Sequence, residues 1–548
     1  MRPLIKFTGD EWARRMNSVF AENLQDLLDK VEDGAGEYER GFLHTSTIDH
    51  EGTCYYDQMW SRDCGRGIIE LAKLGFKDEA LWVTRYFLSH MNFGDHWGRE
   101  LTTKHPNTDM ELDGNANVIL GMYNTYRAWD SDKGIAMEII DGVKPVIDWM
   151  EGLSMKSPYD GLLPSRSELS GNPETDYLVY GIFGNYGALN ALKSLLTMVE
   201  ECRKYKEEVD EFSNRLQILI KRISDGIEKY LISDGISSLT EEGCFINGMD
   251  SREKKPYDIC EFADIVCDCW HWTRQTPYIF HGDIGQNVID GEFEEVHKKS
   301  YRFLRKYMND GKYFRKYGFV SNTGWTGMGG RHDDTMCGYG QAYFTQAALI
   351  ADDINTYSKC FEGIARLAYD GDIILHKTND INPWVMHECF DYSNYEEGLD
   401  HTYGPDSEEH PGVANNPGDE GNLVQAAEVI KALRIVVGVE SKGGKLIIMP
   451  RLPWTCDSIE VRNYPVADKD GIIRRIGFIY AHERWLRKTT LTLTSCKGFE
   501  KIDVRFGPYP YFIKDNRGYQ TEQVENGTWM WQRNQDVSKG EFVVDLNG

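Results

Sequence analysis

The chain lacks the features expected of a membrane-embedded, secreted or nucleic-acid-binding protein. No window is as long and apolar as a transmembrane helix, and residues 1–10 contain no apolar core of a secretory leader. Basic residues are in deficit, with 61 Lys and Arg against 87 Asp and Glu. The net charge of -26 repels phosphate backbones and anionic lipid surfaces. We therefore predict neither a nucleic-acid partner nor a membrane partner.

Paired cysteines are also missing. The 12 cysteines are scattered and form no Cys-x-x-Cys pair, so neither a disulfide framework nor a zinc finger is indicated. Cys267 and Cys269 are separated by one residue, whereas structural zinc sites space their cysteines by about two to four residues. The pattern predicts reduced thiols, a cytoplasmic location, and no metal ion or other cofactor.

Aromatic residues are abundant, at 12% of the chain, with 14 Trp and 30 Tyr. Such residues suit either stacking on sugar rings or ordinary core packing. The most informative stretch is Trp60-Ser61-Arg62-Asp63, directly before an apolar helical run. An indole can stack on the C–H face of a sugar, while a guanidinium and a carboxylate can bind its hydroxyls. The alternative is a helix start with one buried Trp and one surface ion pair.

The spacing of apolar residues divides the chain into two regions. Between residues 9 and 438, a period of three and four predicts about a dozen helices, separated by long loops at 92–114, 152–178, 310–337 and 380–421. Loops of this length in a compact domain are usually functional. After Ser441 the sequence reads as strands, for example at 445–450, 489–494 and 542–546. We predict a mainly α protein with a helical domain, 1–438, and a β-sandwich domain, 439–548.

This layout and several motifs resemble the glucoamylase-like six-hairpin glycosidases. The resemblance rests on Trp60-Ser61-Arg62-Asp63, on Glu168 between two helices and on Glu388 late in the helical region. Residues 444–453 are also similar to the opening of the β domain in rhamnosidase-like members. The resemblance implies an (α/α)6 toroid whose long loops build a pocket at one end. It also implies exo-action, inversion, an oligosaccharide or glycoside substrate and no metal; the oligomeric state stays open.

Hydrolysis of a glycoside by inversion needs two carboxyl groups about 6.5–9.5 Å apart, one as general acid and one as general base. On the resemblance, Glu168 is the candidate acid, with Glu174 and Asp176 as alternatives. Glu388 is the candidate base, although Glu388-Cys389-Phe390 lacks the Gln that the family carries. The other candidates for the base are Asp391, Glu397 and Glu420.

A further set of residues is expected to bind the substrate, because each is an aromatic or polar residue on a long loop or at a helix start. For Asp113 and His332 a helix-start role is the alternative, and for any single Trp the alternative is core packing. The expected substrate-binding residues are Trp60, Arg62, Asp63, Asp113, Trp97, Trp325, His332 and Trp384.

The sequence thus predicts an exo-acting glycoside hydrolase. Three alternatives stay open: a phosphorylase in which phosphate replaces water, a lyase that acts on uronic acids through Tyr and His, and a non-catalytic carbohydrate-binding protein. The sugar, the anomer and the linkage are not indicated, because small loop changes alter the specificity of such pockets.

Overall fold

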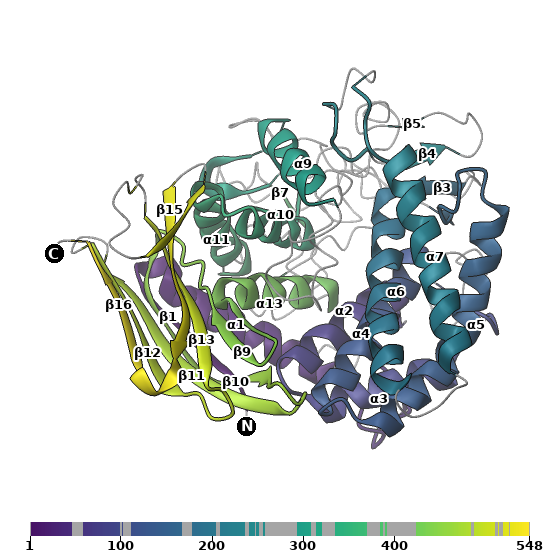
Figure 1. Cartoon of the computed structure of the whole chain (residues 1–548), viewed down its shortest axis with the longest axis horizontal. Coiled ribbons are helices and arrows are strands. Elements are labelled where there is room, and N and C mark those ends of the chain that lie inside the picture. The colour runs from purple at the N-terminus through teal and green to yellow at the C-terminus, as the bar shows by residue number, and fades with distance from the viewer. Residues whose placement is uncertain are drawn as a thin grey trace, which may run out of the picture.

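The computed structural model shows a mainly helical chain with a strand-rich C-terminal region (Figure 1). None of the helices in the described part of the chain is long and apolar enough to cross a membrane. The structure describes residues 2–45, 59–98, 101, 111–166, 178–203, 209–235, 241–246, 248–250, 256–257, 293–307, 314–320, 335–369, 384–386, 389–391, 423–483, 487–509, 513, 519–524 and 527–546.

Eleven α-helices lie within these ranges, which confirms the predicted helical character. Local signals set some of their starts: Asp10 and Asp132 each accept a backbone N–H three residues later at 3.0 Å. The helices are α1 (Glu11–Asp29), α2 (Ser61–Lys73), α3 (Lys77–Ser89), α4 (Leu112–Ala128), α5 (Lys133–Lys156), α6 (Ile182–Arg203), α7 (Val209–Tyr230), α9 (Glu294–Tyr307), α10 (Gly338–Ile350), α11 (Ile354–Tyr369) and α13 (Leu423–Val437).

The helices form an inner and an outer set. Every residue of α10 and α13 is buried, and α2 and α4 are buried almost throughout, whereas α1, α7 and α9 each bury one face. The inner helices α2, α4, α6, α10 and α13 pack as neighbours, α2 lying between α4 and α13. Helices α2 and α4 approach closely because glycines face the contact. A Cβ on Gly65 would overlap the backbone of Asn117, and one on Gly121 would lie 2.9 Å from Ile68 Cβ.

The C-terminal strands form two five-stranded sheets, in the orders β1-β10-β11-β12-β16 and β14-β15-β13-β9-β8. The sheets face one another: Tyr480 stacks on Phe506 with centroids 6.1 Å apart, and the Thr489 and Tyr509 hydroxyls are hydrogen-bonded at 2.8 Å. The strands are β1 (Leu4–Gly9), β8 (Val439–Lys442), β9 (Lys445–Ile448), β10 (Cys456–Ala467), β11 (Ile473–Glu483), β12 (Lys488–Ser495), β13 (Lys501–Tyr509), β14 (Gln520–Val524), β15 (Gly527–Asp536) and β16 (Glu541–Asp545).

Strand β1 departs from the predicted division at residue 438. It pairs antiparallel with β10, so the first strand of the chain forms the edge of a sheet built mainly from the last hundred residues (Figure 1). Its alternate residues Ile5 and Phe7 are buried, and Phe7 meets Phe361 of α11 edge to face at 5.4 Å. The N-terminal segment therefore contributes to the sheet as well as leading into α1.

A buried ion cluster joins the sheets to the helices. Asp352, in the turn between α10 and α11, accepts Arg451 Nε at 3.0 Å and both terminal nitrogens of Arg505 at 2.9 Å. Both arginines are 3% exposed. One carboxylate thus pairs with two buried guanidinium groups from the strand region.

Replacing Asp352 with asparagine is expected to lower the free energy of unfolding by about 3–5 kcal/mol, because both buried arginines would lose the carboxylate that they share. Asparagine tolerates the backbone φ of 55° at this position, so backbone strain is not added. Urea unfolding measures the change. Asp141→Asn, which removes an exposed ion pair with Lys144, is the control and should leave stability unchanged. Equal effects of the two variants would contradict the account of the cluster.

Two small sheets precede two of the inner helices. Strands β2 (Ser165–Arg166), β3 (Leu178–Gly181), β4 (Gly248–Asp250) and β5 (Pro256–Tyr257) form one small sheet, and β3 runs directly into α6. Strands β6 (Thr335–Cys337) and β7 (Cys389–Asp391) form another, and β6 runs directly into α10. Both small sheets therefore lie where inner helices begin.

Candidate functional site

The inner helices begin at one common end. Ser61, the first residue of α2, lies against Gly114 in the first turn of α4, and Leu112 of α4 lies against Gly184 in the first turn of α6. On the other side, the backbone N–H of Tyr339 in α10 donates to Gln425 of α13. The helices are therefore parallel, and their N-terminal first turns surround one region.

Arg62 occupies this region as part of a buried charge cluster. Its Nε donates to Asp63 Oδ1 at 2.7 Å and its Nη1 to Glu111 Oε1 at 3.2 Å. Arg62, Asp63 and Glu111 are 6%, 1% and 4% exposed. The guanidinium also lies 5.5 Å from the centre of the Trp60 ring. The ion pair of this motif is therefore buried and not at the surface. It is part of a cluster in which one cation lies between two carboxylates.

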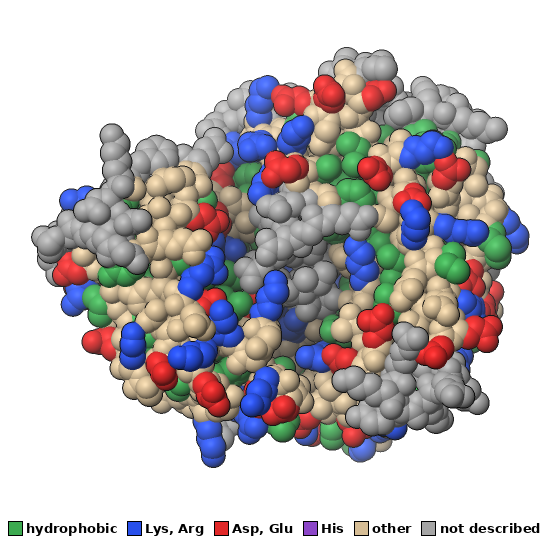
Figure 2. All heavy atoms as spheres, viewed as in Figure 1, with side chains coloured by type: hydrophobic (Ala, Val, Ile, Leu, Met, Phe, Trp, Pro, Cys, Tyr) green, Lys and Arg blue, Asp and Glu red, His purple; other side chains and the backbone are tan. Residues whose placement is uncertain are grey.

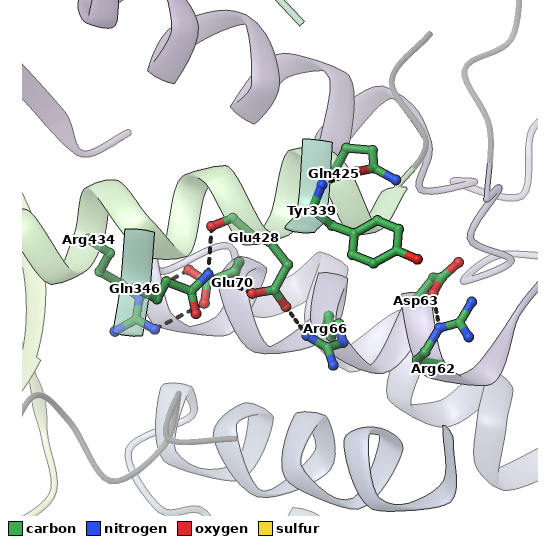
Figure 3. Close-up of polar contacts among 9 residues, drawn as sticks. All are labelled: Arg62, Asp63, Arg66, Glu70, Tyr339, Gln346, Gln425, Glu428 and Arg434. Carbon is green, nitrogen blue, oxygen red and sulfur yellow. Dashed lines mark hydrogen bonds and ion pairs between the residues drawn. The ribbon is translucent and has the colours of Figure 1, made fainter. Parts of the chain in front are cut away.

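Several buried polar atoms at this end have no hydrogen-bond partner within the described part of the chain. They are Asp63 Oδ2, Ser61 Oγ and Gln425 Nε2. Asp113, 7% exposed, also lies at this end, and its charge acts on Arg66. Figure 3 shows the Tyr339 ring and the Gln425 amide directed toward the side of the view that holds Asp63. A buried polar atom without a partner costs about 1–3 kcal/mol, so this arrangement is suited to a polar ligand.

A second layer of charges lies one turn deeper and fixes α2 against α13 and α10. Arg66 is paired with Glu428, and Glu428 Oε2 also accepts Gln346 Nε2 at 2.7 Å (Figure 3). Two turns deeper, Glu70 and Arg434 form a two-bond ion pair with both distances 3.0 Å. These pairs are almost fully buried, and they hold the helix turns that carry Arg62 and Asp63.

Lys431 is a buried amine within this second layer. Burial lowers its pKa to about 8, against the opposing attraction of Glu428. Since the unfolded chain has the higher pKa of 10.5, the folded protein binds fewer protons between these values. Lysine protonation therefore opposes folding fully below pH 8, and stability rises as the pH increases from 8 to 10.5.

The variant Lys431→Met is expected to lose this rise in stability. Between pH 8 and pH 10.5, the wild type should gain about 3 kcal/mol of unfolding free energy relative to the variant. Urea unfolding of both proteins at several pH values gives the difference directly. A difference that is flat across this range would show that Lys431 titrates in the folded protein as it does in the unfolded chain.

Among the predicted binding residues, Trp97 lies in the core. It is 0% exposed, its Nε1 donates to the Phe87 carbonyl at 2.8 Å, and its ring meets the Phe87 ring edge to face. Asn115 holds its backbone from both sides. Both faces of the indole are occupied by protein, so Trp97 is a packing residue and has no face open to a sugar.

Trp384 is partly buried and packs against the hydrophobic core. Asn23 of α1 accepts the Met386 N–H and donates to the Trp384 carbonyl, which holds residues 384–386 against α1. Leu27, one turn further along α1, packs at Gly67 of α2.

Most of the other predicted site residues lie outside the described residues: Glu168, Glu388, Trp325, His332, Glu174, Asp176, Glu397 and Glu420. Asp391 is described only as backbone in β7.

The two predicted catalytic carboxylates each stand next to a strand of the small sheets in the sequence: Glu168 follows β2 and Glu388 precedes β7. Ser165 of β2 accepts the backbone N–H of Leu112, the first residue of α4, at 3.3 Å. Residues 167–177 connect β2 to β3. Cys389 of β7 pairs with Cys337, the residue immediately before α10. The strands next to both carboxylates in the sequence thus adjoin the helix starts that surround Arg62 and Asp63.

Three residues of this site were not predicted from the sequence: Glu111, Tyr339 and Gln425. Glu111 stands two positions before Asp113, and either acid suits a helix start equally well. Gln425 is one of four buried polar residues of α13, with Glu428, Lys431 and Arg434, and the sequence alone does not identify their partners. Only the packing of α10 on α13 brings Tyr339 and Gln425 together.

No protein-family model matches the sequence, and no curated protein does. Solved structures with the same fold are found. The α-L-rhamnosidase of Streptomyces avermitilis complexed with L-rhamnose has a TM-score of 0.53 at 10% identity, over 99% of this chain and 42% of that one. The α-L-rhamnosidase of Dictyoglumus thermophilum has a TM-score of 0.50 at 10% identity, over 99% and 50%. A sialidase has a TM-score of 0.53 at 11% identity, over 88% and 38%.

The chain spans half or less of the length of each of these proteins. The rhamnosidases belong to the six-hairpin glycosidase superfamily, so the resemblance drawn from the sequence is confirmed at the level of the fold. Identities near 10% extend the likeness no further than the fold, and fold alone does not define activity.

Proposed function

We propose that this chain is an exo-acting glycoside hydrolase that removes a terminal sugar with inversion. The observation that carries the proposal is the convergence at one end of the inner helices. A buried carboxylate with an unpartnered oxygen, Asp63, lies there, and the strands next to Glu168 and Glu388 in the sequence adjoin the same helix starts. A binding group and two catalytic carboxylates are the parts that such a reaction requires.

The order of the helices supports opposite positions for the two carboxylates. The β2–β3 pair adjoins α4, and β7 pairs with β6, which leads into α10. Helices α2 and α13 lie between α4 and α10 in the packing order. An acid and a base delivered from opposite sides can act on opposite faces of one sugar ring, which inversion requires. We further propose that the inner and outer helices belong to a closed (α/α)6 toroid.

In the proposed reaction, Arg62 and Asp63 hold the terminal sugar, and Asp113 binds a second hydroxyl. Trp60, Trp384, Trp325 and His332 complete the walls of the binding site. Glu168 donates its proton to the glycosidic oxygen as the C–O bond breaks. Glu388 accepts a proton from the water that attacks the anomeric carbon from the other face, so the products are a free sugar and an alcohol.

The test is hydrolysis of a panel of aryl glycosides and oligosaccharides by the purified protein, without added phosphate. Release of a terminal monosaccharide from at least one substrate is expected. Turnover that requires phosphate and yields a sugar phosphate would instead identify a phosphorylase. A product that absorbs in the ultraviolet from a uronate-containing substrate would identify a lyase. Binding of oligosaccharides with no turnover of any would leave a carbohydrate-binding protein.

A further inference from the structure

The charges around the proposed sugar site are unequal in number. At the helix starts one cation, Arg62, lies among three carboxylates, Asp63, Glu111 and Asp113. Arg62 lies against two of these carboxylates and Arg66 against Glu428, so both guanidinium groups already have anionic neighbours. All six side chains are 7% exposed or less. The described part of the site therefore carries a formal excess of two negative charges.

This excess is a property of the buried site. On the face shown in Figure 2, acidic and basic side chains are interspersed over helices and strands. At the helix starts, by contrast, water is largely excluded, and charges interact more strongly there than at the surface. The positive ends of the helices would by themselves favour an anionic ligand, but Asp63 and Asp113, in the first turns of α2 and α4, already occupy that role.

The buried atoms without a partner determine which hydrogen bonds a ligand must donate and accept. Asp63 Oδ2 can only accept a hydrogen bond as a carboxylate, Gln425 Nε2 can only donate, and the Ser61 hydroxyl can do either. A sugar hydroxyl satisfies each of these groups, because it both donates and accepts. A carboxylate or phosphate brings no proton for Asp63 and adds a further negative charge beside Asp63 and Asp113.

We propose that this site is selective for uncharged sugars and excludes sugar acids and sugar phosphates, with Asp63 and Asp113 as the residues that determine this selectivity. The inference rests on the proposed function, since it assigns the substrate class of the same site. Among the described residues at the helix starts, Arg62 and Arg66 already lie against carboxylates of the protein.

Calorimetric titration with matched neutral and acidic sugars tests the selectivity. The probes are glucose, galactose and mannose, each with its uronate, and L-rhamnose as a further neutral sugar. At least one neutral sugar should bind, and the corresponding uronate should bind at least about 10-fold more weakly, as expected for one uncompensated charge contact. The variant Asp113→Asn should bring the two affinities closer together, with Asp63→Asn as a second variant and Asp141→Asn as an exposed control.

The outcomes separate this inference from the proposed function. Binding of a uronate as tightly as its neutral partner, or a ratio that neither site variant changes, would overturn the selectivity while leaving a sugar-binding site. Binding of no sugar in the panel, neutral or acidic, would contradict both the inference and the proposed function. The circular dichroism spectrum of each variant is compared with that of the wild type, to separate a loss of binding from a loss of folding.

Discussion

Replacing Asp63 with asparagine should lower kcat/KM for the glycoside substrate by about 10²- to 10³-fold, the cost of removing one preorganised polar group from an active site. Asparagine has the same shape, and its carbonyl oxygen can still accept the Arg62 Nε hydrogen bond that Asp63 Oδ1 accepts at 2.7 Å. The charge and the second acceptor, Oδ2, are lost. Because Oδ2 has no hydrogen-bond partner among the described residues, replacing it breaks no hydrogen bond between those residues.

The matched control is Asp78→Asn, which makes the same chemical change at an exposed position of α3 and should leave activity unchanged. Steady-state kinetics on the substrate found in the panel measures the effect, and urea unfolding checks stability. Near-normal kcat/KM in Asp63→Asn would remove Asp63 from the substrate site. A loss of activity that follows a loss of stability would make Asp63 a structural residue.

The second large effect is expected for Glu168→Gln. Without its general acid, the protein should lose about 10²- to 10⁴-fold in kcat for glycosides with a poor leaving group, such as alkyl glycosides and oligosaccharides. Glycosides of acidic phenols should be affected far less, because a dinitrophenolate leaves without a proton. Glu174→Gln, in the same segment, is the control that separates the first candidate from the second.

The dependence on the leaving group distinguishes the acid from the base. Glu388→Gln should slow hydrolysis of all substrates alike, since activation of water is needed whichever group leaves. The assignment of Glu168 would be contradicted by a loss that is equal for alkyl and dinitrophenyl glycosides. The assignment of Glu388 would be contradicted by normal turnover of Glu388→Gln, and Asp391, Glu397 and Glu420 would then be the candidates for the base.

The local sequence was sufficient to predict helix starts and part of the site. The motif around Arg62 and Asp63 placed a cation and an anion in the first turn of α2, and the structure has them there, buried and paired. The strands predicted at 445–450, 489–494 and 542–546 coincide with β9, β12 and β16, because β-branched and apolar residues alternate there.

Contacts between distant residues could not be predicted in the same way. Trp97 looked like a loop aromatic suited to a sugar, but only the packing of Phe87 and Asn115 around it shows that it is enclosed. The pairing of β1 with β10 joins residues more than four hundred positions apart, and no local pattern specifies it. Glu111 became part of the site only when α2 and α4 were brought together.

The most direct test of the central claim is proton NMR of the first-formed sugar anomer, followed in real time for wild type, Asp63→Asn and Glu168→Gln without added phosphate. The account predicts that the wild type releases a terminal monosaccharide whose anomeric configuration is opposite to that of the substrate, and that both variants release it far more slowly. A product of retained configuration, or equal rates for the three proteins, would contradict a reaction by inversion at the helix starts around Asp63.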